Sequence, residues 1–401
     1  MPDLSLIVVL VIVLALVFDF TNGFHDTANA MATPIATGAM KPKVAVGVAA
    51  LLNLVGAFLS TEVARTISGG IITEGENGVL ITPELIFAGL IGATVWNLIT
   101  WLRGLPSSSS HALFGGLIGA AIIGIGTNAV DFTVVGAKVV LPALIAPLIA
   151  GVIALLATRL AYVITRREAG RPDGRGGFRS AQIFSSSLVA LAHGTNDAQK
   201  TMGVITLTLI AGGFQAVGSG PVFWVIAVCA LAIALGTYTG GWRIIRTMGT
   251  GLTEVKPAQG FAAETSTAAT ILASSHLGFA LSTTQVASGS VIGSGLGRRG
   301  ATVRWGMAGR ISLGWMLTLP ASAIMGAFAA GLTTLGPIGI ILDALIGGLV
   351  IVVLFRWSRR NRVTHNTMLN DIDDAGGVVK ITKTPRRQKR ADRKIRKEMA
   401  L

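Results

Sequence analysis

The sequence predicts an all-α protein that crosses a membrane many times. Of its 401 residues, 51% are hydrophobic and only 13% are charged, and the mean hydropathy is +0.68. Ordinary soluble domains carry about 25% charged residues. Uncharged runs long enough to span a bilayer recur along the chain, and polar motifs repeat once at a nearly constant spacing. This composition excludes a soluble enzyme, a coiled coil and a disordered regulator.

The net charge of +14 is concentrated in two short segments. Residues 356–401 carry a net +9 and residues 166–179 a net +3, so the remaining chain is nearly neutral. Short segments rich in Lys and Arg are typical of the cytoplasmic side of membrane proteins, and we expect no nucleic-acid partner. The single cysteine, Cys229, excludes a disulfide framework.

The lengths of the apolar runs predict the number of spans. A helix needs roughly 20 apolar residues to cross the hydrocarbon core. Uncharged runs of about that length lie at 44–61, 85–102, 104–130 and 139–158. Longer runs that must fold back or break lie at 201–242, 265–297 and 311–342. The apolar segment 4–18 lacks the flanks of a signal peptide and is expected to be a retained helix. We therefore expect about 11 membrane-crossing segments, some of them discontinuous.

The Lys/Arg bias of the loops predicts the orientation in the plasma membrane. The acidic segment 62–78 and the uncharged turn 212–221 are expected outside, and the N-terminus with them. The basic positions are expected in the cytoplasm: Lys41, Lys43, Arg103, the loop 166–179, Arg243, Arg246, Lys256, Arg298, Arg299, Arg304 and the tail. For the loops to alternate between the outside and the cytoplasm, the segments 107–127 and 281–297 must each cross the membrane as broken helices. The tail either rests on anionic lipid headgroups or stays solvated.

Two pairs of polar motifs indicate an internal duplication. GFHDTANAM at 23–31, expected at the end of the first span, matches GTNDAQKTM at 194–202 with an offset of 171 residues. SSSSH at 107–111 matches STTQ at 282–285 with an offset of 174, and both lie beside Gly or Pro breaks. Because the two halves start on opposite sides by the loop charges, the repeats are expected to be inverted, with broken or re-entrant hairpins and a substrate site at their interface.

The repeats and the basic segments divide the chain into five parts. They are a first inverted transmembrane repeat (1–165), a basic cytoplasmic loop (166–180), a second inverted transmembrane repeat (181–335), a last transmembrane helix (336–357) and a basic cytoplasmic tail (358–401).

Asp26 and Asp197 occupy equivalent positions in the two repeats. An ionised carboxylate at the bilayer centre costs at least about 2.5–3.5 kcal/mol, so it is expected to face a polar cavity and meet a cation. The alternative is a pair of interfacial carboxylates that cap helices. The equivalence of the two positions favours a cation site, which would take Na⁺, Mg²⁺ or a proton. Asn29, Asn196 and Gln199 offer carbonyl oxygens to such an ion.

Six hydroxyl side chains in the second motif pair point to an anion. They are Ser108, Ser109, Ser110, Ser282, Thr283 and Thr284. They lie at expected helix starts, where backbone N–H groups and the positive end of the helix dipole also favour anions. A tetrahedral oxyanion needs many such donors. The alternative is helix packing through small residues.

The remaining polar residues of the motifs leave alternatives open. Lys200 follows Asp197 by three positions, so it shares a helix face with it and either pairs with it or adds positive charge to the anion site. His25, His111 and His193 are candidates for a proton relay, because the unperturbed pKa of histidine lies near 6.5. Each of them alternatively packs as a neutral, hydrogen-bonded side chain.

The charges of these groups predict the type of transport. Two carboxylates, one lysine and a divalent oxyanion carry a net charge of −3, which is strongly self-repelling at low dielectric. Binding must therefore bring positive charge as protons, sodium ions or a divalent metal bound to the anion. The sequence predicts obligatory symport with a cation.

Four segments resemble the signature regions of the inorganic phosphate transporter (PiT) family: GFHDTANA (23–30), GLPSSSSHA (104–112), AHGTNDAQKT (192–201) and STTQVASG (282–289). The resemblance covers about residues 10 to 357. It implies a homodimeric secondary transporter of two inverted repeats, with phosphate between the hairpin tips. By this resemblance the six hydroxyl residues would hold phosphate, with Gln199 and Lys200 close to it, and Asp26, Asn29, Asn196 and Asp197 would hold the coupling cation.

Two departures bear on the coupling ion. His25 and Gln285 differ from the pattern of the sodium-coupled branch. The segment FHDT is instead similar to the bacterial low-affinity Pit branch, which implies proton coupling and neutral complexes of phosphate with a metal such as Mg²⁺. A neutral complex leaves the site at −1, which one proton offsets. We therefore expect a proton as the coupling ion in preference to Na⁺, and no covalent cofactor.

Three other functions are alternatives to phosphate symport. Another tetrahedral oxyanion such as sulfate is the nearest alternative substrate. A cation channel or antiporter would leave the hydroxyl groups without a role. An intramembrane serine hydrolase lacks a G-x-S-x-G elbow, and His111 lies one residue from Ser110, on a different helix face. Asp343 in the last span has no repeat partner and no assigned role.

Overall fold

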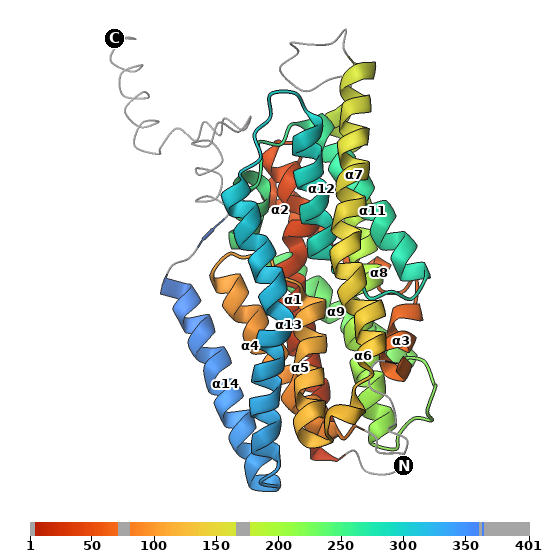
Figure 1. Cartoon of the computed structure of the whole chain (residues 1–401), viewed down its shortest axis with the longest axis vertical. Coiled ribbons are helices and arrows are strands. Elements are labelled where there is room, and N and C mark those ends of the chain that lie inside the picture. Colours follow the sequence, from red (N-terminus) through yellow and green to blue (C-terminus); the bar gives the residue numbers. More distant parts are fainter. Residues whose placement is uncertain (1–4, 71–80, 166–176, 361–362, 365–401) are drawn as a thin grey trace, which may run out of the picture.

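The protein is a bundle of helices that run along one long axis (Figure 1). The computed structural model describes residues 5–70, 81–165, 177–360 and 363–364. Over these ranges the regular structure is helical, apart from one isolated antiparallel bridge between Thr253 and Val303. The prediction of an all-α chain with several apolar helices is therefore confirmed.

The first half of the chain has a long helix, a hairpin and a second long helix. Its elements are α1 (Leu6–Ala36), α2 (Pro42–Gly56), α3 (Glu62–Gly70), α4 (Pro83–Leu102), α5 (Ser109–Gly124), α6 (Phe132–Val135) and α7 (Leu141–Ile164). A 3₁₀ turn, η1 (Thr127–Ala129), precedes α6, and a π-helical turn, η2 (Gly136–Val140), joins α6 to α7.

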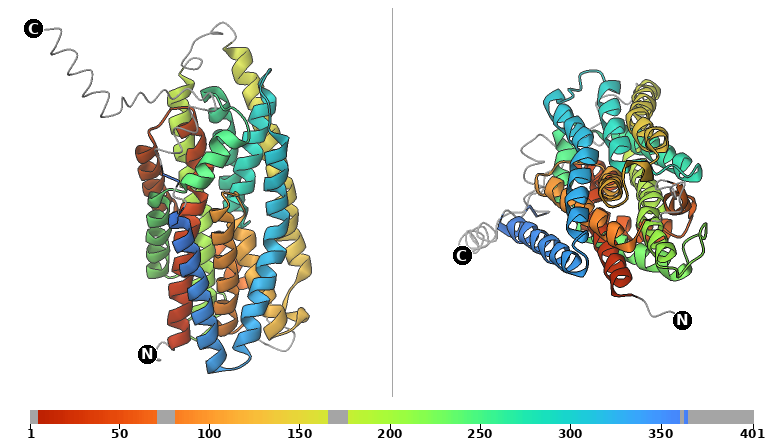
Figure 2. Two further views of the ribbon diagram at one scale, coloured as in Figure 1. Left: turned by 90° about the vertical axis from the view of Figure 1, so that its left-hand side faces the viewer. Right: turned by 60° about the horizontal axis from the view of Figure 1, so that its bottom comes forward.

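The second half repeats this order. Its elements are α8 (Phe178–Ala211), α9 (Phe223–Thr239), α10 (Trp242–Arg246), α11 (Pro257–His276), α12 (Thr283–Gly297) and α13 (Trp305–Thr333), and α14 (Pro337–Arg360) follows. The π-helical turn η4 (Thr247–Gly251) extends α10. Figure 2 shows α14 at the edge of the bundle, where it packs on α4 and α13. The three long apolar runs do break as predicted, between α8 and α9, α11 and α12, and α13 and α14.

Length and hydropathy identify fewer spans than the sequence predicts. Five described helices are long and apolar enough to cross a membrane, or six if the pair Phe223–Thr239 and Trp242–Gly251, bent by 58°, counts as one span. Helix α8 has 34 residues but is outside this set, because polar motif residues lower its hydropathy. The count of about 11 stays a prediction.

The first polar motif, residues 23–31, lies in the C-terminal half of α1, which continues beyond it to Ala36. Its location at the end of the first span stays a prediction. The basic loop and the tail fall largely on residues 166–176, 361–362 and 365–401, which lie outside the described residues, as do 71–80 of the acidic segment.

The segments 107–127 and 281–297 belong to two helical hairpins, α4–α5 and α11–α12. Their crossing of the membrane as broken helices stays a prediction. The hairpin α4–α5 occupies the lower half of the bundle and α11–α12 the upper half (Figure 1). Each chain reversal contains a glycine with positive φ, Gly104 at 63° and Gly278 at 71°, a conformation that disfavours side chains. Arg103 lies at the end of α4, at the reversal of the first hairpin, and its cytoplasmic location stays a prediction.

The two halves pack through reciprocal contacts. Helix α5 packs on α13 and α12 on α7, just as α1 packs on α9 and α2 on α8. In the first pair, a Cβ added to Gly119 would lie 1.9 Å from the carbonyl oxygen of Ala323. In the second pair, a Cβ added to Gly293 would lie 1.9 Å from the carbonyl oxygen of Gly151. Glycine lets both helix pairs approach to backbone contact, which fixes the two hairpins in the bundle.

Candidate transport site

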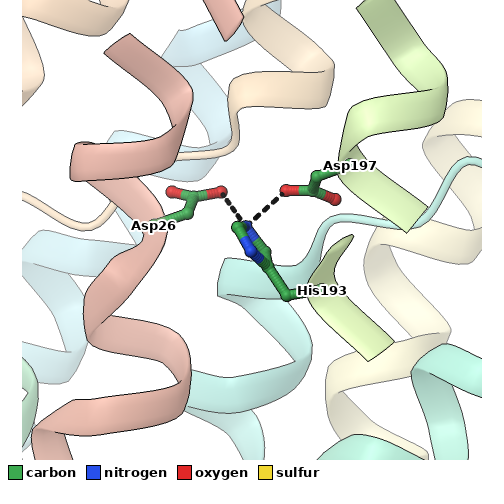
Figure 3. Close-up of side chains that lie close together, drawn as sticks. All are labelled: Asp26, His193 and Asp197. Atoms are coloured by element: carbon green, nitrogen blue, oxygen red, sulfur yellow. Dashed lines mark ion pairs between the residues drawn. The ribbon is translucent and has the colours of Figure 1, made fainter. Parts of the chain in front are cut away.

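Side chains of both polar motifs meet at one buried point. Asp26 of α1 and Asp197 of α8 face each other across His193 of α8 (Figure 3). All three are at most 2% exposed, and each offers a ligand atom within 4.8 Å of the others. Neither carboxylate lies at a helix end, so neither caps a helix, and the two positions form one acidic centre.

His193 bridges the two carboxylates. Its Nε2 lies 3.0 Å from Asp197 Oδ2 and 3.9 Å from Asp26 Oδ2. Its Nδ1 lies 3.1 Å from Asn53 Oδ1, and Asn53 donates from Nδ2 to Thr237 Oγ1 at 2.7 Å. Since Thr237 donates its own proton to a carbonyl, the amide of Asn53 is held with its oxygen toward the ring. Nδ1 thus faces an acceptor, whereas Nε2 lies within ion-pair distance of both carboxylates but has no hydrogen-bond partner among the described residues.

Hydroxyl groups of the second half of the chain donate to the carboxylate of Asp26 in the first half. Thr284 Oγ1 donates to Asp26 Oδ1 at 3.1 Å, and Thr283 Oγ1 lies 3.4 Å from Asp26 Oδ2. Ser109 of α5 also donates to Asp26 Oδ2, at 3.1 Å. Asn29 donates its amide to Thr284 and Thr283, at 3.0 and 3.3 Å. The carboxylate of Asp26 therefore occupies a hydroxyl cluster of the kind predicted for an oxyanion.

Asp197 has a cationic partner of its own. Lys200 Nζ lies 2.5 Å from Asp197 Oδ1 and forms a direct ion pair with it. A contribution of Lys200 to the anion site stays a prediction. Asn196 donates to the same oxygen at 2.9 Å, and Thr283 donates to Oδ2 at 3.1 Å. Lys200 and Asn196 also donate to the carbonyl oxygen of Leu281, at 3.1 and 3.0 Å. These contacts tie α8 to the tip of the α11–α12 hairpin.

The starts of α5 and α12 are built alike. The hydroxyl oxygen of Ser108 accepts from the backbone N–H of His111 at 3.2 Å, and that of Ser282 accepts from Gln285 at 3.4 Å. Both serines therefore act as helix N-caps. Ser110 reaches across and donates to the carbonyl of Leu281 at 3.2 Å. The positive ends of the two helices thus lie at the acidic centre, where they favour negative charge.

The other two histidines lie at different distances from the centre. His25 Nδ1 is 2.6 Å from Asp26 Oδ1, and its Nε2 is 3.3 Å from Ser107 and 3.4 Å from Thr100. His111 faces the amide of Gln285 at 3.5 Å. His25 and His193 therefore touch the acidic centre, and His111 lies between the two hairpins.

Gln199 is the predicted site residue that points elsewhere. Its Oε1 accepts from the backbone N–H groups of Val63 and Ala64 at the start of α3, at 2.8 and 3.2 Å, and its Nε2 donates to the carbonyl of Thr195. The whole amide is used to anchor α3 on α8. In this geometry Gln199 offers neither the carbonyl ligand to the cation nor the contact to the anion that the sequence predicts.

Two buried carboxyl groups were missed by the sequence analysis. Asp19 of α1 is fully buried, and Glu264 of α11 is 2% exposed. Glu264 accepts from Thr33, from Gln182 at 3.1 Å and from Ser185 at 2.6 Å. Each is an acidic residue inside or beside an apolar run, which is the signal that could have identified both; they were overlooked because neither belongs to a repeated motif.

The chain matches known phosphate transporters along most of its length. A model described as "Phosphate transporter family" matches residues 22–326. A protein of Mycobacterium tuberculosis (strain ATCC 25618 / H37Rv) is 54% identical over 368 residues, which are 91% of this chain and 87% of the relative. One of Bacillus subtilis (strain 168) is 40% identical over 331 residues, covering 82% and 98%. Both are named "Probable low-affinity inorganic phosphate transporter".

A solved structure supports the fold. "The sodium-dependent phosphate transporter" superposes with a TM-score of 0.71 at 24% identity, covering 82% of this chain and 99% of that one. Similarity at this identity shows the fold alone. The family and these relatives are transporters, so the rejection of a serine hydrolase is confirmed. With about three quarters of its sequence inside the family match and close bacterial relatives along nearly all of it, the chain belongs to the phosphate transporter family.

Proposed function

We propose that this protein is a secondary-active symporter that imports inorganic phosphate together with a cation, and that the cation is a proton. The observation that carries the proposal is the convergence of the two aspartates with hydroxyl groups of both hairpins at one buried point. A membrane protein places such polar groups in its core only where they serve a pathway or a substrate.

Phosphate would bind at the hairpin tips. Ser109, Thr283 and Thr284 donate to the carboxylates in this conformation. A bound cation that neutralises Asp26 and Asp197 would weaken these hydrogen bonds and release the hydroxyl groups toward phosphate. Ser108, Ser110 and Ser282 and the N–H groups at the helix starts would complete the site. Phosphate and the cation would thus bind together, because without the cation the hydroxyl groups that phosphate needs remain hydrogen-bonded to the carboxylates.

The coupling cation would bind between Asp26 and Asp197, with Asn29 and Asn196 beside them. The contacts of His193 favour a proton: an imidazolium places one positive charge between the two carboxylates. His25 extends this path toward Thr100 and Ser107. If phosphate entered as a complex with a metal such as Mg²⁺, less negative charge would remain for the proton to compensate. Sodium is the alternative ion, since carboxylate and amide oxygens also suit it.

The reciprocal packing supports two inverted repeats. Contacts between α5 and α13 have counterparts between α7 and α12, and the hairpins point in opposite directions (Figure 1). In such transporters one repeat rocks against the other around a fixed site. We further propose a homodimer in the plasma membrane, surrounded by lipid, with the N-terminus outside. Labelling Ala216→Cys in the exposed turn after α8 tests the orientation, because the native Cys229 is buried; an impermeant reagent that reaches position 216 only from the cytoplasm would reverse it.

Phosphate is favoured over other substrates by the relatives' names and by the site. Sulfate stays divalent at neutral pH, whereas phosphate shares protons with the site. A cation channel or antiporter would need the aspartates but not the hydroxyl groups that donate to them.

Uptake of radiolabelled phosphate into proteoliposomes tests the proposal. We expect an inward proton gradient to drive accumulation without sodium, arsenate to compete well and sulfate poorly. Accumulation that requires a sodium gradient at fixed pH and membrane potential would overturn proton coupling, and strong competition by sulfate would overturn the substrate.

A further inference from the structure

Asp19 is a buried carboxyl group that the acidic centre does not use. It lies on α1 seven residues before Asp26, which is about two turns or ~10 Å along the same face of the helix. Its side chain is fully buried, and neither carboxylate oxygen has a hydrogen-bond partner among the described residues. It therefore lies between the end of α1 that we place outside and the site where phosphate would bind.

The surroundings of Asp19 suit a neutral carboxyl group. An ionised carboxylate without a partner in a protein core is disfavoured unless it is paired, and it takes up a proton instead. The titratable groups that act on it are Asp197, His193 and Lys200 of α8 and the thiol of Cys229 of α9. None of them forms an ion pair with it in the described structure. These surroundings favour the neutral, protonated form of the carboxyl group.

Polar side chains of α8 and α1 lie next to Asp19. Thr201 of α8 lies beside Asp19 and is next in sequence to Lys200, the partner of Asp197. Asn22 is one turn from Asp19 on α1, and its Oδ1 has no partner among the described residues. Buried polar atoms of this kind are where bridging water gains hydrogen bonds. Thr201 and Asn22 would therefore let water bridge Asp19 toward the acidic centre.

We propose that Asp19 passes the coupling proton to the acidic centre. The inference rests on the proposed proton-coupled symport and names a residue for it outside the phosphate site. Asp19 takes a proton from the outer aqueous phase when the site opens outward. Its O–H bond then breaks, and the proton moves through bridging water to a ring nitrogen of His193, which becomes the imidazolium between the two carboxylates. When the site opens inward, His193 releases this proton to the cytoplasm, and Asp19 is protonated again from outside. One proton enters and one leaves in each cycle.

The test separates proton movement from phosphate movement. Asp19→Asn mimics the protonated group and keeps its shape. We expect this variant in proteoliposomes to exchange external radiolabelled phosphate for internal phosphate at equal pH, because the return of the empty carrier is not needed. Accumulation driven by an imposed pH gradient should be lost to the level of empty liposomes. Asp19→Glu, which keeps a carboxyl group, should restore part of the accumulation.

Asp343→Asn is the matched control. Asp343 is also a buried carboxyl group, 2% exposed with an Oδ2 that lacks a partner among the described residues, but it lies on α14. This control should keep both exchange and accumulation.

Two results for Asp19→Asn would overturn the inference. They are accumulation like that of the wild type, and loss of exchange together with accumulation. If the wild type itself does not respond to the pH gradient, the proposed proton coupling fails before any variant is compared.

Discussion

The hydroxyl group of Thr284 donates a hydrogen bond of 3.1 Å to Asp26, a residue 258 positions earlier in the chain. The contact joins a motif of the second half to a motif of the first, across the meeting point of two helix starts. The donor is a hydroxyl group that was predicted to bind the anion, and the acceptor is a carboxylate that was predicted to bind the cation. The predicted anion and cation residues therefore form one connected cluster.

Removing either carboxylate charge should abolish coupled uptake. Asp26→Asn and Asp197→Asn each remove a charge that accepts several hydrogen bonds, and hydrogen bonds to charged groups contribute about 1.5–3 kcal/mol each. We expect gradient-driven phosphate uptake to fall at least about tenfold, the equivalent of ~1.4 kcal/mol. Asp131→Asn is the control, because Asp131 caps α6 away from the centre and asparagine also caps helices. Equal loss in all three variants would contradict the assignment.

Removing the hydroxyl group of Thr284 should weaken phosphate binding. Thr284→Val keeps the shape of the side chain and deletes the donor. A hydrogen bond to a charged group is worth about 1.5–3 kcal/mol, so we expect the apparent KM for phosphate to rise about tenfold or more. Thr208→Val is the control, since Thr208 is buried on α8 and donates only to Val204 of its own helix in the described contacts. An unchanged KM in Thr284→Val would remove this hydroxyl from the phosphate site.

Adding a methyl group to the reciprocal glycines should destabilise the bundle. Gly119→Ala and Gly293→Ala each place a Cβ within 1.9 Å of a backbone oxygen of the neighbouring helix. Overpacking of this kind typically costs about 1–3 kcal/mol, so we expect lower thermal stability in detergent for both. At Gly331 of α13 a Cβ meets nothing within 4 Å. There Gly331→Ala should leave stability unchanged or raise it, and a comparable fall in that variant would refute the packing argument.

Shortening Gln199 should affect structure more than substrate recognition. Gln199→Ala leaves two N–H groups at the start of α3 without their acceptor, and an unsatisfied buried donor costs about 1–3 kcal/mol. We expect a lower thermal stability with an unchanged KM for phosphate in the protein that remains folded. A raised KM at unchanged stability would return Gln199 to the anion site.

The positions and the chemistry of the polar motifs could be predicted from the sequence. How the hairpins pack and which way individual side chains point could not. The two aspartates, Lys200 and the hydroxyl runs are recognisable because charged and hydroxyl groups are rare in apolar runs and recur at offsets of 171 and 174. The hydrogen bonds from Thr283 and Thr284 to Asp26 depend on how the hairpins pack, which the local sequence does not encode. The chain reversals at Gly104 and Gly278 do not by themselves distinguish a crossing from a re-entrant hairpin, because an apolar run has the same composition in either case.

The direction of individual side chains was equally hidden. Gln199 lies two residues from Asp197, yet its amide faces α3, because successive positions of a helix point in different directions. Asp19 was overlooked because it has no counterpart in the second repeat, where Ala190 lies at the same offset.

Proton uptake during phosphate import tests the central claim most directly. Proteoliposomes that contain a pH-sensitive dye, with no sodium and no membrane potential, receive external phosphate with and without Mg²⁺. The account predicts that the interior acidifies as radiolabelled phosphate enters, and that both signals are lost together in Asp26→Asn and Asp197→Asn. Phosphate entry at an unchanged rate without any accompanying proton, sodium or metal ion would contradict it.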